Sequence, residues 1–386
     1  MGGPYKAPPP SFAGLPMNIE LFSCSGGMAE GFRRAGIEID MAFDFNADAC
    51  SSYEQNLGHR PIQMCVRDLL RMVKSGWRHG QIKLLVADPP CTPWSRAGKR
   101  QGLDDERDMV CVTVEIIEFL RPRTWLIGNV PGLDDGDNWR EVVQPIIGGM
   151  ARRAGYAVDY AKLNAADYGT PQHRRRPFWF GRPATSSPID WPPPTHRAPP
   201  VLPGCGLHPW VTCRDALAHL SSENVGRPCQ LRSRAARQRH SPSRIDEPGH
   251  AVTCSQSGNG GSVLVGNRKP DANRPPAPLD SPHRTITSVA DQAILEWPWD
   301  RPCTTIQGDE RLNRPGHHDP EVSNDQHLHG IILSEKAGAA LQGFPSSWVF
   351  SGSSKRTRWS QIGQAMPPQL SEAVGRSIAR WMERDK

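Results

Sequence analysis

The sequence lacks several features that would point to whole classes of protein. None of its apolar runs approaches the roughly 18 residues that indicate a membrane-spanning helix. Its ten cysteines never form a Cys-x-x-Cys pair, which argues against a zinc ribbon and against a redox motif. The first 17 residues, rich in Gly and Pro, lack the apolar core of a signal peptide. These absences predict a cytoplasmic protein of 386 residues with reduced thiols and no membrane partner.

Proline is scarce in one part of the chain and abundant in the next. Residues 18–182 hold 9 prolines in 165 positions, whereas residues 183–320 hold 21 in 138. Because proline interrupts helices and central strands, the second stretch should consist mainly of loops, turns and edge strands. The contrast predicts a regular domain over 18–182 and a loop-rich domain over 183–325. A flexible tail over 1–17 precedes them, and a segment over 326–386 is expected to return to the first domain.

The net charge of +6 becomes informative only through the placement of the charges. Residues 227–244 contain six arginines and no acidic residue. One interpretation is a solvated basic loop. The other is a segment that contacts the phosphates of a nucleic acid and loses affinity as salt rises. The second interpretation assigns such contacts to Arg232, Arg234, Arg237 and Arg239.

The proline-poor stretch alternates apolar strands with helices. Strands are predicted at residues 18–22, 37–44, 83–87, 124–127, 156–163 and 174–181, and helices at 28–36, 47–58, 107–120 and 138–155. Strands that alternate with helices of this length imply an α/β fold with a mostly parallel sheet covered on both faces. A last helix over 367–384 is expected to pack back on this sheet.

Ligands of such sheets bind at the carboxyl ends of the strands, and three sequence features fall there. Residues 23–27, Ser-Cys-Ser-Gly-Gly, form a turn where the backbone can approach a ligand at a helix N-terminus. Asp44 ends the next strand, where a carboxylate can accept both hydroxyls of a ribose. Asp68 is expected at a third strand end, near an adenine amino group. Together they predict a nucleoside-binding site.

Cys91 directly follows a buried strand and two prolines that fix the backbone. The loop after it is rich in Gly and charge. A thiol at this edge, beside Arg and Lys, is placed to act as a thiolate nucleophile, whereas the alternative is a structural cysteine. The constrained and polar surroundings favour the nucleophile.

The ordered motifs resemble those of the DNA (cytosine-5) methyltransferases. They include Glu-Leu-Phe-Ser-Cys-Ser-Gly-Gly at 20–27, Asp-Pro-Pro-Cys-Thr-Pro-Trp-Ser at 88–95, Gly-Asn-Val at 128–130, Gln-His-Arg-Arg-Arg at 172–176 and Gly-Gln-Ala-Met-Pro-Pro at 363–368. The resemblance spans nearly the whole chain. It implies a Rossmann-like, class I fold that binds S-adenosylmethionine, joined to a smaller β-containing target-recognition domain. It also implies a monomeric enzyme, bacterial or phage-encoded, that modifies double-stranded DNA.

The resemblance implies roles for individual residues. Cys91 would attack C6 of a cytosine flipped out of the duplex, and C5 would then take an alkyl group. Arg174 would order the active site and Arg176 would donate to the cytosine O2. Asn129 and Ser95, the latter reaching the phosphate backbone, complete the catalytic set, Gln172 contacts DNA, and no metal is implied. The implied cofactor residues are Phe22, Ser23, Ser25, Gly26, Gly27, Asp44, Phe45, Asp68, Leu69, Asp88, Pro90, Gln364 and Ala365.

The sequence departs from the family pattern at two important places. Gly128 stands where the family has the glutamate of Glu-Asn-Val, which holds cytosine N3 and N4 and protonates N3. Such general-acid catalysis is worth roughly 10²- to 10⁴-fold. The cofactor pocket is the other place: Cys24 occupies a usual Gly, and Gln364 replaces the Asn of the family's Gly-Asn-Ala-Val-Pro-Pro, which is Gly-Gln-Ala-Met-Pro-Pro here. That segment lies near the methionine end of the cofactor.

Three accounts of Gly128 stay open. Another acid replaces the glutamate, and Asp88 is the candidate. Alternatively, the chain is a catalytically silent DNA-binding homologue. In the third account the donor is carboxy-S-adenosylmethionine, which delivers a carboxymethyl group. A glutamate about 5 Å from that anionic group would cost about 3 kcal/mol at an effective dielectric near 20, and Gly128 removes this repulsion.

Overall fold

The structure is a computed structural model. It describes residues 17–77, 81–90, 109–134, 136–220, 226–230, 302–303, 305–306, 311–313 and 329–385. Six residues to which the sequence assigned roles lie outside these ranges, namely Cys91, Ser95, Arg232, Arg234, Arg237 and Arg239. No helix among the described residues combines the length and apolar character needed to cross a membrane.

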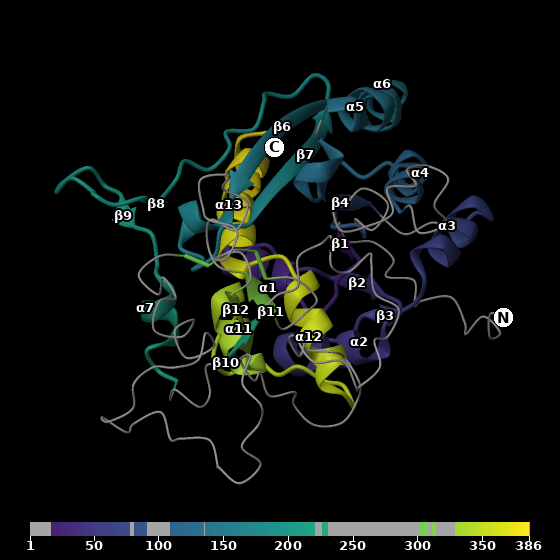
Figure 1. Ribbon diagram of the computed structural model, residues 1–386. Coiled ribbons are helices and arrows are strands. Elements are labelled where there is room, and N and C mark those ends of the chain that lie inside the picture. Colours follow the sequence, from purple (N-terminus) through teal and green to yellow (C-terminus); the bar gives the residue numbers. More distant parts are fainter. Residues whose placement is uncertain are drawn as a thin grey trace, which may run out of the picture.

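A seven-stranded sheet forms the centre of the molecule (Figure 1). Its strands, in the order β3-β2-β1-β4-β5-β7-β6, are β1 Met17–Leu21, β2 Met41–Asp44, β3 Ile62–Gln63, β4 Ile82–Ala87, β5 Thr124–Gly128, β6 Tyr156–Asn164 and β7 Arg175–Pro183. The pairs from β3 across to β5 are parallel, and β7 pairs antiparallel with both β5 and β6. The mostly parallel sheet inferred from the strand and helix pattern is therefore confirmed.

Helices cover both faces of this sheet (Figure 1). One face is covered by α3 Val66–Lys74, α4 Val110–Leu120, the π-helical stretch Trp139–Gly148 and α6 Gly149–Ala154. The other is covered by α1 Gly27–Arg34, α2 Ala47–Leu57 and α13 Pro368–Arg384. Strand residues alternate between the two resulting cores: Leu85 and Ala87 of β4 join the α4-side core, and Leu84 and Val86 join the α13-side core. Because both faces are buried, the strands read as continuous apolar runs.

The helix predicted over residues 138–155 differs from the observed structure. A short helix, α5 Gly136–Asn138, leads into the π-helical stretch Trp139–Gly148, and α6 follows. Pro145 lies inside the π-helical stretch. Proline has no N–H for the helical ladder and its ring clashes with the preceding turn, so the wider winding accommodates it.

A smaller cluster of buried side chains forms a second core. Its elements are α7 Cys213–Leu217, α11 Glu335–Gln342, α12 Lys355–Gln364 and β12 His329–Leu333, and β12 pairs antiparallel with β10 Gly226–Gln230 and β11 Arg311–Asn313. The rest of the described structure is β8 His196–Arg197, paired with β9 His208–Pro209, and the short helical turns Pro131–Leu133 and Ala165–Tyr168. Thus α11 and α12 contribute to the second core, whereas α13 packs on the large sheet.

The α13-side core continues beyond the composition boundary at residue 183. Ile189 is buried in the α13-side core, and Trp191 packs against it. The Trp381 indole of α13 donates to the Ser187 carbonyl at 2.7 Å. Proline content marks where regular structure ends, but these apolar residues still bury themselves against the sheet domain.

Helix α13 crosses α1 at very short range (Figure 1). A Cβ added at Gly31 would lie 2.4 Å from the Pro368 carbonyl oxygen and 2.4 Å from Ser371 Cβ. Real Cβ atoms do not approach so closely, so Gly31 allows this crossing. Since α1 begins at the turn after β1, the contact fixes the C-terminal helix beside the ligand edge of the sheet.

Replacing Gly31 with alanine is therefore expected to lower the free energy of unfolding by about 1–3 kcal/mol, the usual cost of overpacking. Gly149→Ala is the matched control, since Gly149 is helical and its added Cβ would meet nothing closer than 3.5 Å. That control is expected to be neutral or slightly stabilising. Urea unfolding of both variants measures the difference, and equal stabilities would contradict the close-packing argument.

Candidate functional site at the carboxyl edge of the sheet

The turn that follows β1 has a strained backbone. Phe22 and Cys24 have φ angles of 60° and 49°, in the left-handed region that favours glycine. The Cys24 amide donates to Asp44 Oδ2 at 2.8 Å, and the Asn46 amide donates to Oδ1 at 2.8 Å. The structure thus brings together the Ser-Cys-Ser-Gly-Gly turn and the Asp44 carboxylate, as the strand-end rule predicted.

The same edge offers groups that suit a nucleoside with a polar tail. Ser23 is buried, and its Oγ has no hydrogen-bond partner among the described residues. Phe45, next to Asp44, is 68% exposed, which is unusual for a large aromatic side chain. Ser25, Gly26 and Gly27 are buried in the turn itself. A fixed carboxylate, an exposed ring and an unpaired hydroxyl fit S-adenosylmethionine.

Asp68 and Leu69, both predicted to bind the cofactor, lie in helix α3. Asp68 is not at a strand end, because β3 stops at Gln63 and Asp68 lies in the first turn of α3, paired with Arg71. Leu69 is 1% exposed and packs in the core. A cofactor contact from Leu69 stays a prediction. An adenine contact from Asp68 stays a prediction.

Asn129 holds the segment that leads toward Cys91. Its Nδ2 donates to the Pro89 carbonyl at 3.2 Å, and its backbone amide donates to the Pro177 carbonyl at 3.1 Å. Asn129 is 1% exposed. The ends of β4, β5 and β7 are thereby tied together, with Pro90 exposed at the end of the described segment.

Arg174 and Gln172 connect the sheet to the second core. Arg174 Nη1 donates to the Ile306 carbonyl at 2.7 Å, and Nη2 donates to the Gly363 carbonyl at 2.9 Å. Gln172 Nε2 donates to Gln342 Oε1 at 2.8 Å, and Gln172 Oε1 accepts from the Ile306 amide at 2.8 Å. Gln172 is 0% exposed. Contrary to the prediction, it cannot contact DNA in this structure, because both ends of its amide are used inside the protein.

The residues after Gly363 lie beside this junction. Gln364 ends α12 and is exposed, whereas Ala365 is buried, and its carbonyl accepts from Gln342 Nε2 at 2.5 Å. Arg176 is 7% exposed and belongs to β7. Gln342 had no role in the sequence analysis, because nothing in the sequence marks it as the partner of Gln172.

Three carboxyl groups lie near one another at this edge. Burial raises the pKa of Glu20, Asp44 and Asp88, and the elevation is largest for Glu20, where Asp44 adds to it. Arg176 and Arg174 partly oppose the elevation at Asp88. The Tyr53 hydroxyl interacts with Glu20, yet neither that hydroxyl nor Glu20 Oε2 has a hydrogen bond of normal geometry among the described residues. Glu20 is not among the site residues predicted from the sequence, where its only distinguishing feature is a charge inside an apolar strand.

The space beside Gly128 is already filled. Gly128 ends β5 and is registered with Phe178 of β7. A Cβ added at Gly128 would lie 3.1 Å from Met366 Cε and 3.1 Å from Phe178 Cε1. Both side chains are buried. Met366 stands where the family pattern has the shorter valine, so its extra length fills volume next to the missing side chain.

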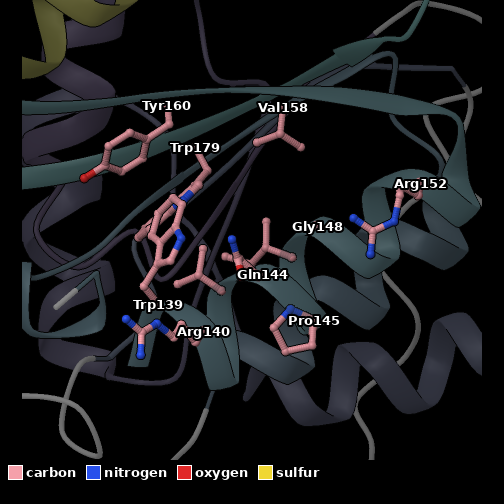
Figure 2. A pocket seen from close by; sticks show the side chains of 11 residues that line it. Trp139, Arg140, Gln144, Pro145, Gly148, Arg152, Val158, Tyr160 and Trp179 are labelled. Atoms are coloured by element: carbon pink, nitrogen blue, oxygen red, sulfur yellow. The ribbon is translucent and has the colours of Figure 1, made fainter. Parts of the chain in front are cut away.

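A separate hollow of about 650 Å³ lies under the face of the sheet that carries α6 (Figure 2). Trp139, Tyr160, Trp179 and Arg152 are among its lining residues (Figure 2). Trp179 packs in the core opposite to that of Phe178, so the sheet separates this hollow from the Gly128 side. No three His, Cys, Asp or Glu side chains gather as a metal site within the described parts of the chain.

The fold and the edge geometry define a class I S-adenosylmethionine-dependent methyltransferase. Among solved structures, a DNMT2 variant of Spodoptera frugiperda is 14% identical, with coverage of 94% of this chain and 99% of that chain, and a TM-score of 0.55. The Dnmt2 methyltransferase of S. pombe is 16% identical, with coverage of 95% and 99% and a TM-score of 0.53. These likenesses concern the fold.

The chain belongs to the C-5 cytosine-specific DNA methylase family, whose model matches residues 17–242 and 272–380. Type II methyltransferase M.NgoMIV of Neisseria gonorrhoeae is 26% identical over 95% of this chain and 98% of its own length. M1.HphI of Haemophilus parahaemolyticus is 27% identical over 94% and 86%. M.AgeI of Thalassovita gelatinovora is 33% identical, but the match spans only 51% of its length. The resemblance read from the motifs is confirmed.

Introducing the family's glutamate by Gly128→Glu is expected to lower the free energy of unfolding by about 1–3 kcal/mol, because its Cβ meets Met366 and Phe178. Met366→Val in the same chain should restore most of the loss by freeing the space of the Met366 methyl group. Urea unfolding of both single variants and the double variant gives the coupling free energy. Strictly additive effects would contradict a shared volume.

Glu20→Gln is expected to remove a pH-dependent destabilisation. Because the Glu20 pKa is raised in the folded state, the folded protein keeps a proton that the unfolded chain releases near pH 4.3, about the free value. The free energy of unfolding should therefore fall as pH rises from there toward the folded pKa. The cost is about 1.4 kcal/mol for each pH unit between the two pKa values.

Urea unfolding of the Glu20→Gln variant at pH 5 and pH 8 tests this expectation. The variant should gain stability over the wild type at pH 8 and little at pH 5. Glu38→Gln, at an exposed site, is the control and should follow the wild type at both values. The same pH dependence in Glu20→Gln and wild type would contradict the assignment.

Proposed function

We propose that this protein is a DNA cytosine-C5 methyltransferase that uses S-adenosylmethionine and acts on double-stranded DNA. The observation that carries the proposal is the meeting of two half-sites at one edge of the sheet. The turn after β1, with Asp44 and Phe45, forms the cofactor half. Arg174 and Arg176 form the base half. The segment that leads into Cys91 runs between them and is held by Asn129.

The chain's own residues divide the work of the proposed reaction. Asp44 accepts the ribose hydroxyls and Phe45 covers the adenine of S-adenosylmethionine, which when bound supplies an electrophilic methyl group. The Cys91 thiolate adds to C6 of the flipped cytosine and thereby makes C5 nucleophilic. Arg176 donates to the cytosine O2, and Arg174 keeps the base half in place. Loss of the C5 proton and elimination of Cys91 complete the cycle.

The relatives bear on the biological setting. M1.HphI and M.NgoMIV carry the name type II methyltransferase, which supports DNA modification in a bacterial or phage genome as the role. A monomer that works in the cytoplasm and reads its DNA site through the proline-rich domain completes the proposal. Ser95 and the arginines at 232, 234, 237 and 239 are proposed to contact the DNA backbone.

Gly128 motivates the second candidate, carboxymethyl transfer from carboxy-S-adenosylmethionine. Two observations weigh against it. Met366 and Phe178 lie beside Gly128, so the lost glutamate frees little space for an added carboxylate there. Asp88 also keeps a carboxyl group at this edge. We therefore propose methyl as the transferred group. The buried contacts of Arg174 and Asn129 favour an active site over a silent homologue.

The proposal is tested by incubating duplex DNA with S-adenosylmethionine or with carboxy-S-adenosylmethionine and digesting the product for nucleoside mass spectrometry. We expect 5-methylcytosine with the first donor. Cys91→Ala should abolish it, whereas Cys205→Ala, at an exposed cysteine, should not. Formation of 5-carboxymethylcytosine would favour the second candidate. DNA binding without either product would indicate the silent homologue.

A further inference from the structure

We propose that Asp88 is the general acid of this enzyme and donates a proton to N3 of the target cytosine, the role that a glutamate at position 128 has in the family pattern. This inference rests on the proposed cytosine-C5 chemistry. It accounts for catalysis by a chain in which Gly128 has no side chain to offer.

Asp88 follows the strand next to that of Gly128. Ala87 of β4 is registered with Ile127 of β5, so the next residues, Asp88 and Gly128, lie at the same level of the sheet. Side chains alternate along a strand, and Val86 and Leu126 both belong to the α13-side core. By the same alternation, Asp88 and a side chain at position 128 would lie on the same face of the sheet.

The surroundings of Asp88 suit a group that gives up a proton. Arg176 and Arg174 are the cations that act on its carboxyl. Arg176 lies two residues before Phe178, the partner of Gly128, and so on the same face of the adjacent strand. When Asp88 loses its proton, these guanidinium groups stabilise the carboxylate. Asn129 fixes the backbone through the adjacent Pro89 carbonyl.

Burial provides the other condition, because it favours the protonated form of the carboxyl. It raises the pKa of Asp88, against the opposing effect of the two arginines. Among the described residues, Glu20 of β1 and Cys24 of the following turn also interact electrostatically with Asp88. A general acid works best when its pKa lies near the working pH, which an ordinary aspartate does not reach.

The proton inventory of the proposed step is balanced. The Cys91 thiolate forms the S–C6 bond, the C5=C6 electron pair moves through C4 toward N3, and N3 takes the Asp88 proton. Asp88 is then a carboxylate. After C5 has gained its methyl group, its proton leaves to solvent, the S–C6 bond breaks and the C5=C6 bond re-forms. The N3 proton returns to Asp88, and Cys91 leaves as the thiolate.

The test compares Asp88→Asn with the wild type in two assays on duplex DNA. One measures methyl transfer, and the other measures exchange of the cytosine C5 hydrogen with deuterated water in the absence of the methyl donor. Both require addition to C6 and N3 protonation. We expect kcat and the exchange rate to fall by roughly 10²- to 10⁴-fold, with little change in the KM for DNA. Wild-type kcat should fall as pH rises through the Asp88 pKa, and the pH profile of the variant should lack this decrease.

Controls separate catalysis from folding. Asp190→Asn, at an 80% exposed side chain, should behave as the wild type in both assays. Circular dichroism and DNA binding should be unchanged in Asp88→Asn. In that background, Gly128→Glu with Met366→Val restores an acid at the family's position and should recover activity at least roughly tenfold, a fraction of the general-acid contribution.

The outcomes distinguish this inference from the proposed function. If the wild type exchanges the C5 hydrogen but transfers no methyl group, the proposed methyl transfer is overturned. The exchange rate of Asp88→Asn then still tests the role of Asp88. Near-wild-type rates in Asp88→Asn, or a retained decrease with rising pH, would overturn the role of Asp88. If the wild type shows neither reaction, both the proposed function and the role of Asp88 are overturned.

Discussion

The buried guanidinium of Arg174 holds together three parts of the chain that are remote in sequence. It lies just before β7 and donates to carbonyls of Ile306 and Gly363. Two nitrogens of a residue that is 2% exposed are thus paired with backbone from the second core and from the end of α12. A buried charge without such partners would be strongly destabilising. The same contacts set where Gly363 and the residues after it lie relative to the sheet edge. The cofactor half and the base half of the site therefore depend on one ionic group.

Gly128 shows how a family position can change without leaving a hole. The volume that a longer side chain would use is taken by Met366 and Phe178, which keeps the interior close-packed. The acidic function is a separate matter, because a proton donor must reach the base rather than fill space. Asp88 stands one strand away at the same level. Volume and acidity are thus supplied by different residues instead of by one.

The sequence predicted the α/β architecture because strands buried on both faces are continuous apolar runs bounded by turns. It could not predict that β7 runs antiparallel, since pairing direction leaves little trace in one strand's composition. It placed Asp44 correctly, because the acid ends a clear strand. It misplaced Gln172, because motif position carries no information on burial. The partners of Gln172 are 134 and 170 residues away, and only the folded chain brings them close.

The acidic edge of the sheet also bears on which donor suits the site. Glu20, Asp44 and Asp88 are near one another, and burial favours the protonated form of each. A sulfonium is a cation, so its presence stabilises the carboxylates and is itself stabilised by them; the linkage is reciprocal. A donor with an added carboxylate cancels that charge and loses the linkage, while it adds an anion close to these acids. At an effective dielectric near 20, two like charges about 5 Å apart repel by about 3 kcal/mol. Wherever one of these acids is ionised, an anionic donor meets this repulsion with or without a glutamate at position 128.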